Sequence, residues 1–283
     1  MWSALAPLTA ATHGIPSLQL LAATFAVAFF SGATWLLVSG GLSGLQRLRQ
    51  PLSYLLFSFA ALFGYHALYF TALSLSPPAQ ASLVAYLWPL LIVCFAALAN
   101  RSQFRARHLI GASMGLAGTA VLVLSRAESG TAWHQNPLGL VAALACAVIW
   151  STYSVLNSRF RNVPSEAMVT VCGLVAVAGW IAHQFIDSQT IRPTGVQWAA
   201  ILALGLGPVG LAFLAWDYGT KHGNIALLGT MSYAAPVLST LLLVLFGFAH
   251  PGIQLLAACV LVVGGAWVAS TSTRLTPVLQ RIR

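Results

Sequence analysis

Long apolar stretches make up most of the sequence, and the few charged residues lie between them. An α-helix needs about 20 apolar residues to cross the hydrocarbon core of a bilayer. Only 6% of the 283 residues are charged, against roughly a quarter in a soluble domain, so the chain cannot cover a water-facing surface. We therefore predict an all-α polytopic membrane protein. The expected spans are about 17–38, 52–74, 79–99, 108–125, 137–157, 165–186, 196–219, 224–247 and 252–271.

The two halves of the sequence resemble each other at a nearly constant spacing. Trp2 recurs as Trp150, 148 residues later, and the motif Tyr-Leu-Trp-Pro at 86–89 recurs as Tyr-Ala-Ala-Pro at 233–236, 147 residues later. A register that persists over most of a half indicates an internal repeat. A repeat unit of five helices is odd, so its second copy enters the membrane from the opposite face. Such inverted repeats are typical of secondary transporters.

Ten transmembrane helices in two inverted five-helix repeats therefore form the predicted fold. The first helix is expected to be truncated at its N-terminus, because Trp150 follows about a dozen residues of its helix and Trp2 follows one residue. The expected units are an N-terminal repeat (1–136), a C-terminal inverted repeat (137–273) and a cytoplasmic basic tail (274–283).

The basic residues fall almost entirely on one side of this topology. Eleven of the 13 lysines and arginines lie in alternate loops or in the tail, and only Arg126 and Arg192 lie on the other side. Because short cytoplasmic loops carry an excess of Lys and Arg, both termini are predicted to be cytoplasmic. The formal charge of +9 is scattered over loops rather than gathered on one face, so nucleic-acid binding is not expected.

Aromatic side chains predicted deep inside the spans are the candidate substrate-binding residues. A phenol or an imidazole that faced lipid would leave a polar group without a partner, so these side chains should face the protein interior. A site lined by aromatic rings suits an apolar or aromatic solute with polar ends. Ordinary helix–helix packing is the alternative for any one of them. The candidates are Tyr65, His66, Tyr69, Tyr86, Trp88, Trp150, Tyr153 and Tyr233.

A second set of aromatic residues is predicted near the ends of the spans, where an interfacial belt is the expected role. Asp217 lies four residues before Lys221 in the same region, and this spacing predicts a local ion pair at the interface. The belt set is Trp35, Tyr54, Trp133, Trp198, Trp216 and Tyr218.

Pro89 and Pro236 occupy matching positions near the middle of their spans. Proline removes a backbone hydrogen bond and kinks a helix, so the pair predicts two symmetric gating hinges, with packing kinks as the alternative. His66 is either a neutral hydrogen-bonding side chain or a contact to solute or a proton-linked gate. No acid other than Asp217 lies within a predicted span, which favours a facilitator or coupling through His66 or backbone carbonyls.

Other classes of function have little support in the sequence. It contains no HExxH motif, no pair of membrane aspartates and no glycine-rich phosphate loop, so we expect no enzyme. The four cysteines lie singly in apolar runs without a CxxC motif, so no metal and no cofactor are predicted. Gly111 and Gly115 form a GxxxG motif that serves packing within a monomer or a dimer contact. We expect a monomer or a weak dimer in the lipid bilayer.

The inverted halves, the early Trp-Ser pair and the mid-helix prolines resemble the drug/metabolite transporter superfamily over nearly the whole chain. Within it, the Tyr-Leu-Trp-Pro motif at 86–89 and the stretch 222–239 are similar to the bacterial aromatic amino acid exporters. The resemblance implies a cavity between the truncated first helix and the spans 52–74, 79–99, 137–157, 196–219 and 224–247. It assigns the lining to His66, Tyr69, Tyr86, Trp88, Trp150 and Tyr153.

The function implied by this resemblance is export of aromatic or other hydrophobic amino acids across the bacterial inner membrane by alternating access. The small-molecule substrate would then be an amino acid, most naturally an aromatic one. The alternatives are an exporter of another small amphipathic metabolite or drug and, from another class, a channel or a non-transporting membrane scaffold.

Overall fold

The computed structural model describes residues 1–76, 78–99, 105–125, 137–187, 189–245 and 252–270. Within these ranges the protein is all-helical, with eight helices long and apolar enough to span a membrane and one shorter apolar helix, Ile253–Ala269. The elements are η1 (Trp2–Ala4), α1 (Leu5–Ala10), α2 (Ser17–Leu45), η2 (Gln46–Leu48), α3 (Leu52–Leu75), α4 (Pro78–Ala85), α5 (Trp88–Ala99), α6 (Ala106–Ser125), α7 (Pro137–Leu156), η3 (Asn157–Phe160), α8 (Ala167–Ile186), α9 (Gly195–Leu204), η4 (Gly205–Leu211), α10 (Ala212–His222), α11 (Ile225–Met231), α12 (Ala234–Leu245) and α13 (Ile253–Ser270).

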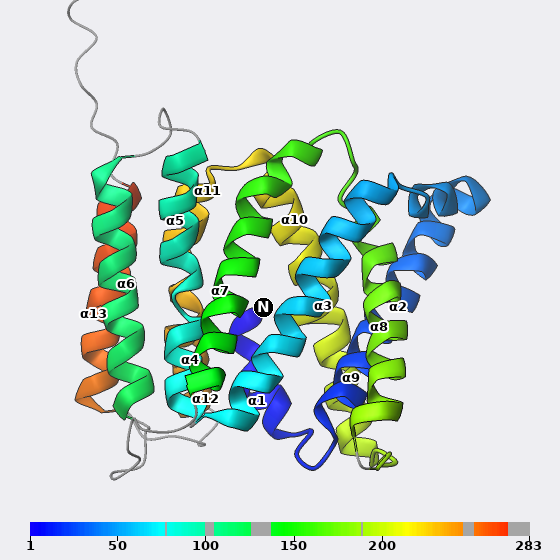
Figure 1. The fold of residues 1–283 in the computed structure, drawn as a ribbon, viewed down its shortest axis with the longest axis horizontal. Helices are drawn as coiled ribbons and strands as arrows, with labels where there is room; N and C mark the ends of the chain where they lie inside the picture. Colours follow the sequence, from blue (N-terminus) through cyan, green and yellow to red (C-terminus); the bar gives the residue numbers. More distant parts are fainter. Residues whose placement is uncertain (77, 100–104, 126–136, 188, 246–251, 271–283) are drawn as a thin grey trace, which may run out of the picture.

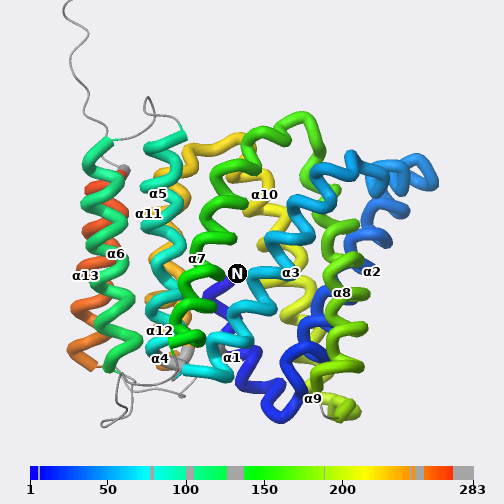
Figure 2. Tube along the Cα trace, in the orientation of Figure 1, coloured from blue at the N-terminus to red at the C-terminus, as the bar shows by residue number. Residues whose placement is uncertain are grey.

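The helices form a bundle whose long axes run between the same two ends of the molecule (Figure 1). Helices α6 and α13 pack together at one side, α2 and α8 pack together at the other, and α3 packs against α7 between them. The tube in Figure 2 shows η1 and α1 running from the middle of the bundle toward one end. The centre of the bundle is therefore bordered by η1, α3, α5, α7 and α10.

The exterior of the bundle is apolar, as a lipid-facing surface requires. Phe30, Phe185 and Trp267 expose 66%, 86% and 68% of their surface, although they are large hydrophobic side chains. Polar side chains such as Asn157, Asp217 and Lys221 are fully buried instead. This inversion of the soluble pattern, together with the apolar helices, identifies a multi-pass membrane protein.

Each of the nine predicted spans overlaps an observed helix. The predicted span 17–38 corresponds to the first part of α2, which continues to Leu45 only across a kink at Gly41. Gly41 has a φ of 58° within it, a left-handed conformation that favours glycine, so the chain bends there. The predicted basic tail (274–283) lies outside the described residues, as do Trp133 and the end of the 224–247 span.

Two spans are each divided into two short helices at the predicted hinge positions. The break between α4 and α5 lies at Tyr86 and Leu87, and the break between α11 and α12 lies at Ser232 and Tyr233. Pro89 and the equivalent Pro236 therefore sit in the first turn of a helix, where a missing N–H removes no intrahelical bond.

A third irregularity lies in the span from Gly195 to His222. Its middle, η4, is a π-helix that contains Pro208. A π-segment inserts an extra residue into the helix and changes the direction of the side chains that follow. The face of α10 therefore cannot be extrapolated from α9 with a regular period.

Helices α6 and α13 approach each other through glycine. A Cβ placed on Gly111 would collide with the carbonyl oxygen of Gly265 and would lie 3.0 Å from Cβ of Ala269. The GxxxG motif thus makes a contact within the chain, which is the first of its two predicted uses.

Gly111→Ala should lower the stability of the bundle by about 1–3 kcal/mol, because the new methyl group overpacks a backbone contact. The measurement is thermal unfolding in detergent followed by size-exclusion chromatography. Gly64→Ala is the matched control, since a Cβ there would lie 3.7 Å from Ile149, an ordinary contact. Equal melting temperatures for the two variants would contradict the prediction.

Candidate functional site

Five aromatic side chains meet at the centre of the bundle, and we call them the central aromatic cluster: Trp2, Trp88, Trp150, Phe213 and Trp216. They come from η1, α5, α7 and α10, so no single helix forms the cluster. The ring of Trp2 lies 5.1 Å from that of Trp216, 6.1 Å from that of Trp150 and 6.3 Å from that of Trp88. These separations are those of edge-to-face and offset aromatic pairs.

Hydrogen bonds from the indole and hydroxyl groups hold the cluster in place. The Trp2 Nε1–H donates to the carbonyl of Pro208 at 3.0 Å, within the π-helix. The Trp216 Nε1–H donates to Ser154 Oγ at 3.1 Å. Ser151 Oγ donates to the carbonyl of Trp88 at 2.8 Å, beside the break between α4 and α5. Buried polar groups need such partners, so the indole orientations of Trp2 and Trp216 are fixed by a backbone carbonyl and a hydroxyl group.

The predicted residues of α3 extend the cluster along one face of that helix. The ring of Tyr65 lies 5.6 Å from Trp150 and is stacked on Tyr69 at 6.0 Å. Residues at positions i and i+4 share a helix face, which is why these two rings stack. Tyr69 Oη lies 3.3 Å from Ser82 Oγ of α4, and this contact joins α3 to the broken helix.

His66 lies on the border of the cluster, between α2 and α10. Its ring is 5.3 Å from that of Phe25 and 6.3 Å from that of Phe213. Its Nδ1 lies 2.7 Å from the carbonyl oxygen of Leu62. Because a carbonyl only accepts, Nδ1 carries the proton, and in the neutral ring Nε2 is then an acceptor.

The tyrosines at the two helix breaks contact each other. Tyr233 Oη donates to the carbonyl of Tyr86 at 3.1 Å. The ring of Tyr233 is fully buried in a second apolar cluster with Val93 and Val237, and Gly115 leaves room for it. Tyr233 therefore connects the two broken helices rather than joining the central aromatic cluster. Tyr153 lies next to that cluster, with its ring 5.3 Å from Trp150.

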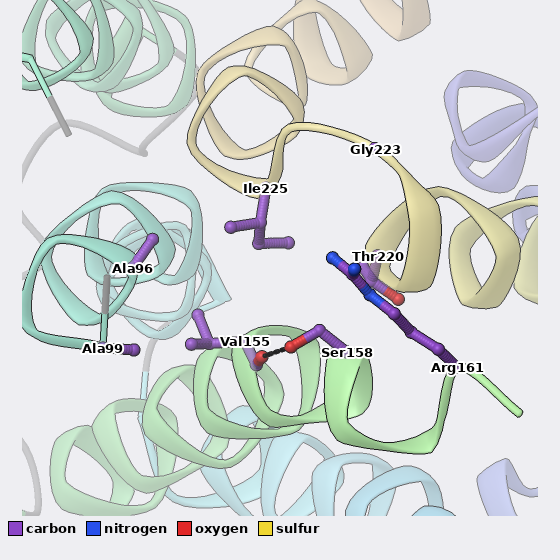
Figure 3. A pocket seen from close by; sticks show the side chains of 8 residues that line it. All are labelled: Ala96, Ala99, Val155, Ser158, Arg161, Thr220, Gly223 and Ile225. Atoms are coloured by element: carbon purple, nitrogen blue, oxygen red, sulfur yellow. Dashed lines mark hydrogen bonds between the residues drawn. The ribbon is translucent and has the colours of Figure 1, made fainter. Parts of the chain in front are cut away.

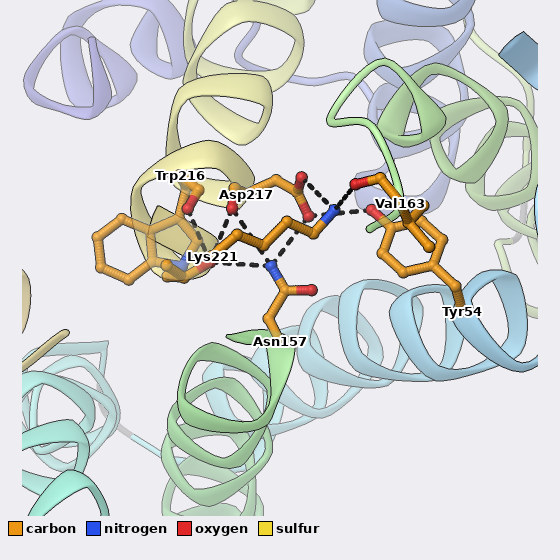
Figure 4. Close-up of polar contacts among 7 residues, drawn as sticks. Tyr54, Asn157, Val163, Trp216, Asp217 and Lys221 are labelled. Carbon is orange, nitrogen blue, oxygen red and sulfur yellow. Dashed lines mark hydrogen bonds and ion pairs between the residues drawn. The ribbon is translucent and has the colours of Figure 1, made fainter. Parts of the chain in front are cut away.

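A buried polar network lies beyond the cluster, at the end of the bundle where η3 and the end of α10 meet (Figure 4). Lys221 Nζ and Asp217 Oδ2 are 2.7 Å apart, and neither side chain is exposed. Tyr54 Oη donates to Asp217 Oδ1 at 3.0 Å, and Asn157 Nδ2 donates to the same oxygen at 2.9 Å. Lys221 Nζ also donates to the carbonyl of Val163 at 3.0 Å.

This network connects α3, η3, the turn after η3 and α10 through one carboxylate and one ammonium group. A charge buried without a partner is costly, whereas a paired and hydrogen-bonded charge is tolerated. The predicted ion pair between Asp217 and Lys221 is confirmed. Both side chains are fully buried inside the protein rather than exposed on its surface.

For two residues the predicted place in the interfacial belt is wrong. Tyr54 is fully buried and Trp216 is 9% exposed, because Tyr54 donates to Asp217 and Trp216 stands in the central cluster. Trp35, Trp198 and Tyr218 are exposed, as a belt requires. The missed members of the cluster are Trp2, Phe213 and Trp216.

The sequence contained a signal for Trp216. It lies 147 residues after Tyr69, the same shift that relates the two helix breaks, so it occupies the repeat position of a predicted site residue. Trp216 also lies close to the end of its predicted span, at 196–219, and this position predicted a role in the interfacial belt instead. Phe213 could not be assigned to the cluster from a regular helical period, because the π-helix before α10 interrupts that period.

Removing one partner of the buried ion pair should destabilise the protein strongly. We expect Lys221→Met to cost about 3 kcal/mol, because it leaves the Asp217 carboxylate buried and unpaired. The double variant Asp217→Asn/Lys221→Met should recover part of this loss. Thermal unfolding in detergent measures both effects.

The ion pair of Arg47 and Glu166 provides the control. Its groups are 2.8 Å apart, against 2.7 Å in the buried pair, but the side chains are 58% and 25% exposed, so Arg47→Gln should have little effect. A melting temperature for Lys221→Met equal to that of Arg47→Gln would show that the buried network does not stabilise the bundle.

Comparison with known proteins adds to this geometry. A model of the EamA-like transporter family matches residues 1–124 and 137–271. The chain is 49% identical over 278 residues to a protein of Ancylobacter novellus named aromatic amino acid exporter YddG, covering 97% of this chain and 94% of that protein. A protein of the same name from Escherichia coli is 27% identical over 245 residues, covering 82% of each chain. A solved crystal structure is similar with a TM-score of 0.89 and 47% identity, covering 97% of this chain and 95% of the other.

Proposed function

The chain belongs to the EamA-like transporter family, and on that premise we propose that it exports aromatic or other hydrophobic amino acids. The observation that carries the proposal is the central aromatic cluster, to which η1, α5, α7 and α10 contribute. Near full-length similarity to proteins named as aromatic amino acid exporters supports the same substrate class. Indole and phenol rings offer stacking and edge-to-face contacts to an aromatic side chain.

The substrate-binding residues in this proposal are those that adjoin the cluster. On α3, Tyr65 contacts Trp150 and stacks on Tyr69, and His66 adjoins Phe213. The indole N–H groups of Trp88 and Trp150 and the free lone pair on His66 Nε2 would supply polar contacts to the ends of an amino acid. Tyr153 is placed at the edge of the site, and Tyr86 and Tyr233 are placed at the helix breaks.

The proposed architecture is ten transmembrane helices in two inverted repeats, 1–136 and 137–273. The family model matches one segment in each half, which supports this division. Equivalent spans also pack against each other, as they can around a two-fold axis: α2 with α8, α6 with α13, and the span of α4 and α5 with the span of α11 and α12, through α5 and α11. Trp2 and Trp150, which are repeat equivalents, meet in the cluster.

The proposed orientation places the ends of α5, η3 and α10 in the cytoplasm. The described basic residues Arg47, Arg105, Arg159 and Arg161 lie at that end of the bundle, and the positive-inside rule assigns them to the cytoplasmic side. The C-terminal tail is then cytoplasmic, and the membrane is the bacterial inner membrane. The predicted cytoplasmic N-terminus is not carried over, because the chain starts in the middle of the bundle, beside the central aromatic cluster (Figure 1).

Transport is proposed to occur by alternating access, with the two helix breaks as hinges. A break leaves a short segment without an uninterrupted hydrogen-bond ladder, so the two half-helices can change their mutual angle at low cost. Pro89 and Pro236 prevent each ladder from closing. The bond from Tyr233 to Tyr86 couples the two hinges, so that they move together.

The proposed transporter is a facilitator. Among the described residues, Asp217 is the acidic residue that lies within a candidate membrane span. Its charge is neutralised by Lys221 at 2.7 Å. A carboxylate committed to an ion pair is poorly suited to carry a proton or a sodium ion across the membrane in each cycle.

The direct test is uptake of labelled phenylalanine or tryptophan by proteoliposomes that contain the purified protein. We expect saturable flux that needs neither a pH gradient nor a sodium gradient. Absence of saturable flux for any amino acid, with folded protein, would reject the proposal and favour another amphipathic metabolite or drug as substrate. Flux that does not saturate would favour a channel.

The site assignment has a separate test in the same assay. Trp88→Ala and Tyr69→Ala should each reduce kcat/KM about tenfold or more, because truncation of a ring in contact with substrate costs at least about 1.4 kcal/mol. Trp198→Ala and Tyr218→Ala are the controls, since these exposed rings (47% and 62%) lie away from the cluster. Unchanged transport by both cluster variants would place the site elsewhere.

A further inference from the structure

A cavity of about 80 Å³ lies at the end of the bundle proposed to face the cytoplasm (Figure 3). It is formed between α5, α7, α10 and α11, together with the turns that follow α7 and α10. One wall is apolar, with Ala96, Val155 and Ile225, and the opposite wall carries Ser158, Arg161 and Thr220. A cavity with this division suits a ligand that has an apolar part and an anionic part.

Arg161 is the group that can bind an anion there. The guanidinium extends over the cavity beside Thr220 (Figure 3). Within the described part of the chain, no ion pair or hydrogen bond engages it, whereas Arg47 pairs with Glu166 at 2.8 Å. The Asp217 carboxylate, which lies in α10 three residues before Thr220, is paired with Lys221. The cavity therefore carries an uncompensated positive charge.

The two hydroxyl groups of the polar wall are already committed. Ser158 Oγ donates to the carbonyl of Val155 at 3.0 Å. Thr220 Oγ1 donates to the carbonyl of Trp216 at 2.9 Å and accepts from Asn157 Nδ2 at 2.9 Å. Recognition of a carboxylate in this cavity consequently depends on the five N–H donors of Arg161, which can bind both carboxylate oxygens at once.

The cavity lies one helical turn from the central aromatic cluster. Ser158 follows Ser154 by four residues, and Thr220 follows Trp216 by four residues. Ser154 and Trp216 are hydrogen-bonded to each other, so the two sites share the same two helix faces. One turn corresponds to roughly 5.4 Å along the axis, which is shorter than an aromatic amino acid.

We infer that this cavity is a cytoplasmic entry site, in which Arg161 binds the α-carboxylate of the amino acid before its ring reaches the central aromatic cluster. The inference rests on the proposed function and assigns the first contact of the substrate to a residue outside the cluster. Ala96, Val155 and Ile225 contact the apolar side chain of the substrate there.

The test measures occupancy of the cavity rather than transport alone. Ser158→Cys, with the four native cysteines replaced by Ala, places a thiol in the wall of the cavity. In inside-out membrane vesicles a water-soluble maleimide labels this thiol, and phenylalanine should slow the labelling. Phenylalaninamide, which has no carboxylate, should not.

Arg161→Gln in this background should raise the phenylalanine concentration that gives half-protection about tenfold, as loss of a charge-assisted bond predicts. Arg161→Lys, which keeps the charge but not the paired donors, should have an intermediate effect. Arg159→Gln is the control, because it removes the same charge from the same segment and is not part of the cavity wall.

Equal half-protection concentrations for Arg161→Gln and Arg159→Gln would overturn the inference. Protection by phenylalaninamide as strong as that by phenylalanine would also overturn it. If phenylalanine does not slow the labelling of Ser158→Cys although the protein transports phenylalanine, the inference of an entry site is wrong and the proposed function stands. A folded protein that carries no amino acid would instead fail the proposed function.

Discussion

Every backbone polar group at membrane depth must find its partner inside the protein, and this requirement explains where the irregular segments lie. The breaks in two spans and the π-helix in a third each expose backbone carbonyls. Aromatic and hydroxyl side chains meet these carbonyls: Tyr233 bonds to Tyr86, Trp2 to Pro208 and Ser151 to Trp88. Irregular backbone and the aromatic cluster therefore occur together. The groups that would bind substrate are also the groups that make the broken helices possible.

The buried ion pair follows from the same requirement. Asp217 and Lys221 lie where water cannot solvate them, so each depends on partners from other elements. Movement of α10 away from α3 would separate the carboxylate from Tyr54, and movement away from η3 would separate it from Asn157. The network consequently favours the arrangement of these four elements that the structure shows. In the proposed transport cycle, opening toward the cytoplasm must either break these bonds or move the four elements as one unit.

The fold was predictable from the sequence to the extent that it depends on hydropathy and on the position of proline. The nine apolar runs overlap observed helices, and the prolines marked both breaks, because span length and missing N–H groups are local properties. The burial of Trp216 and Tyr54 was not predictable in this way. It depends on how far α10 is rotated by the π-helix and on a carboxylate from a distant part of the chain. The distance of a residue from the end of an apolar run predicts neither the rotation of its helix nor the hydrogen-bond partners that other helices supply.

The chemistry of the central aromatic cluster has a consequence for substrate selection. Indole rings bind many apolar groups, and a ring surface cannot distinguish strongly between substrates that differ by a hydroxyl or a methylene. Discrimination between an amino acid and an apolar compound without charge must then come from charged or hydrogen-bonding groups. Asp217 and Lys221 neutralise each other, and the His66 Nδ1–H is committed to Leu62. Arg161 also carries a charge beside a cavity, and within the described residues no ion pair neutralises this charge. In the inferred entry route, selection for a carboxylate would thus come before the contacts that hold the ring.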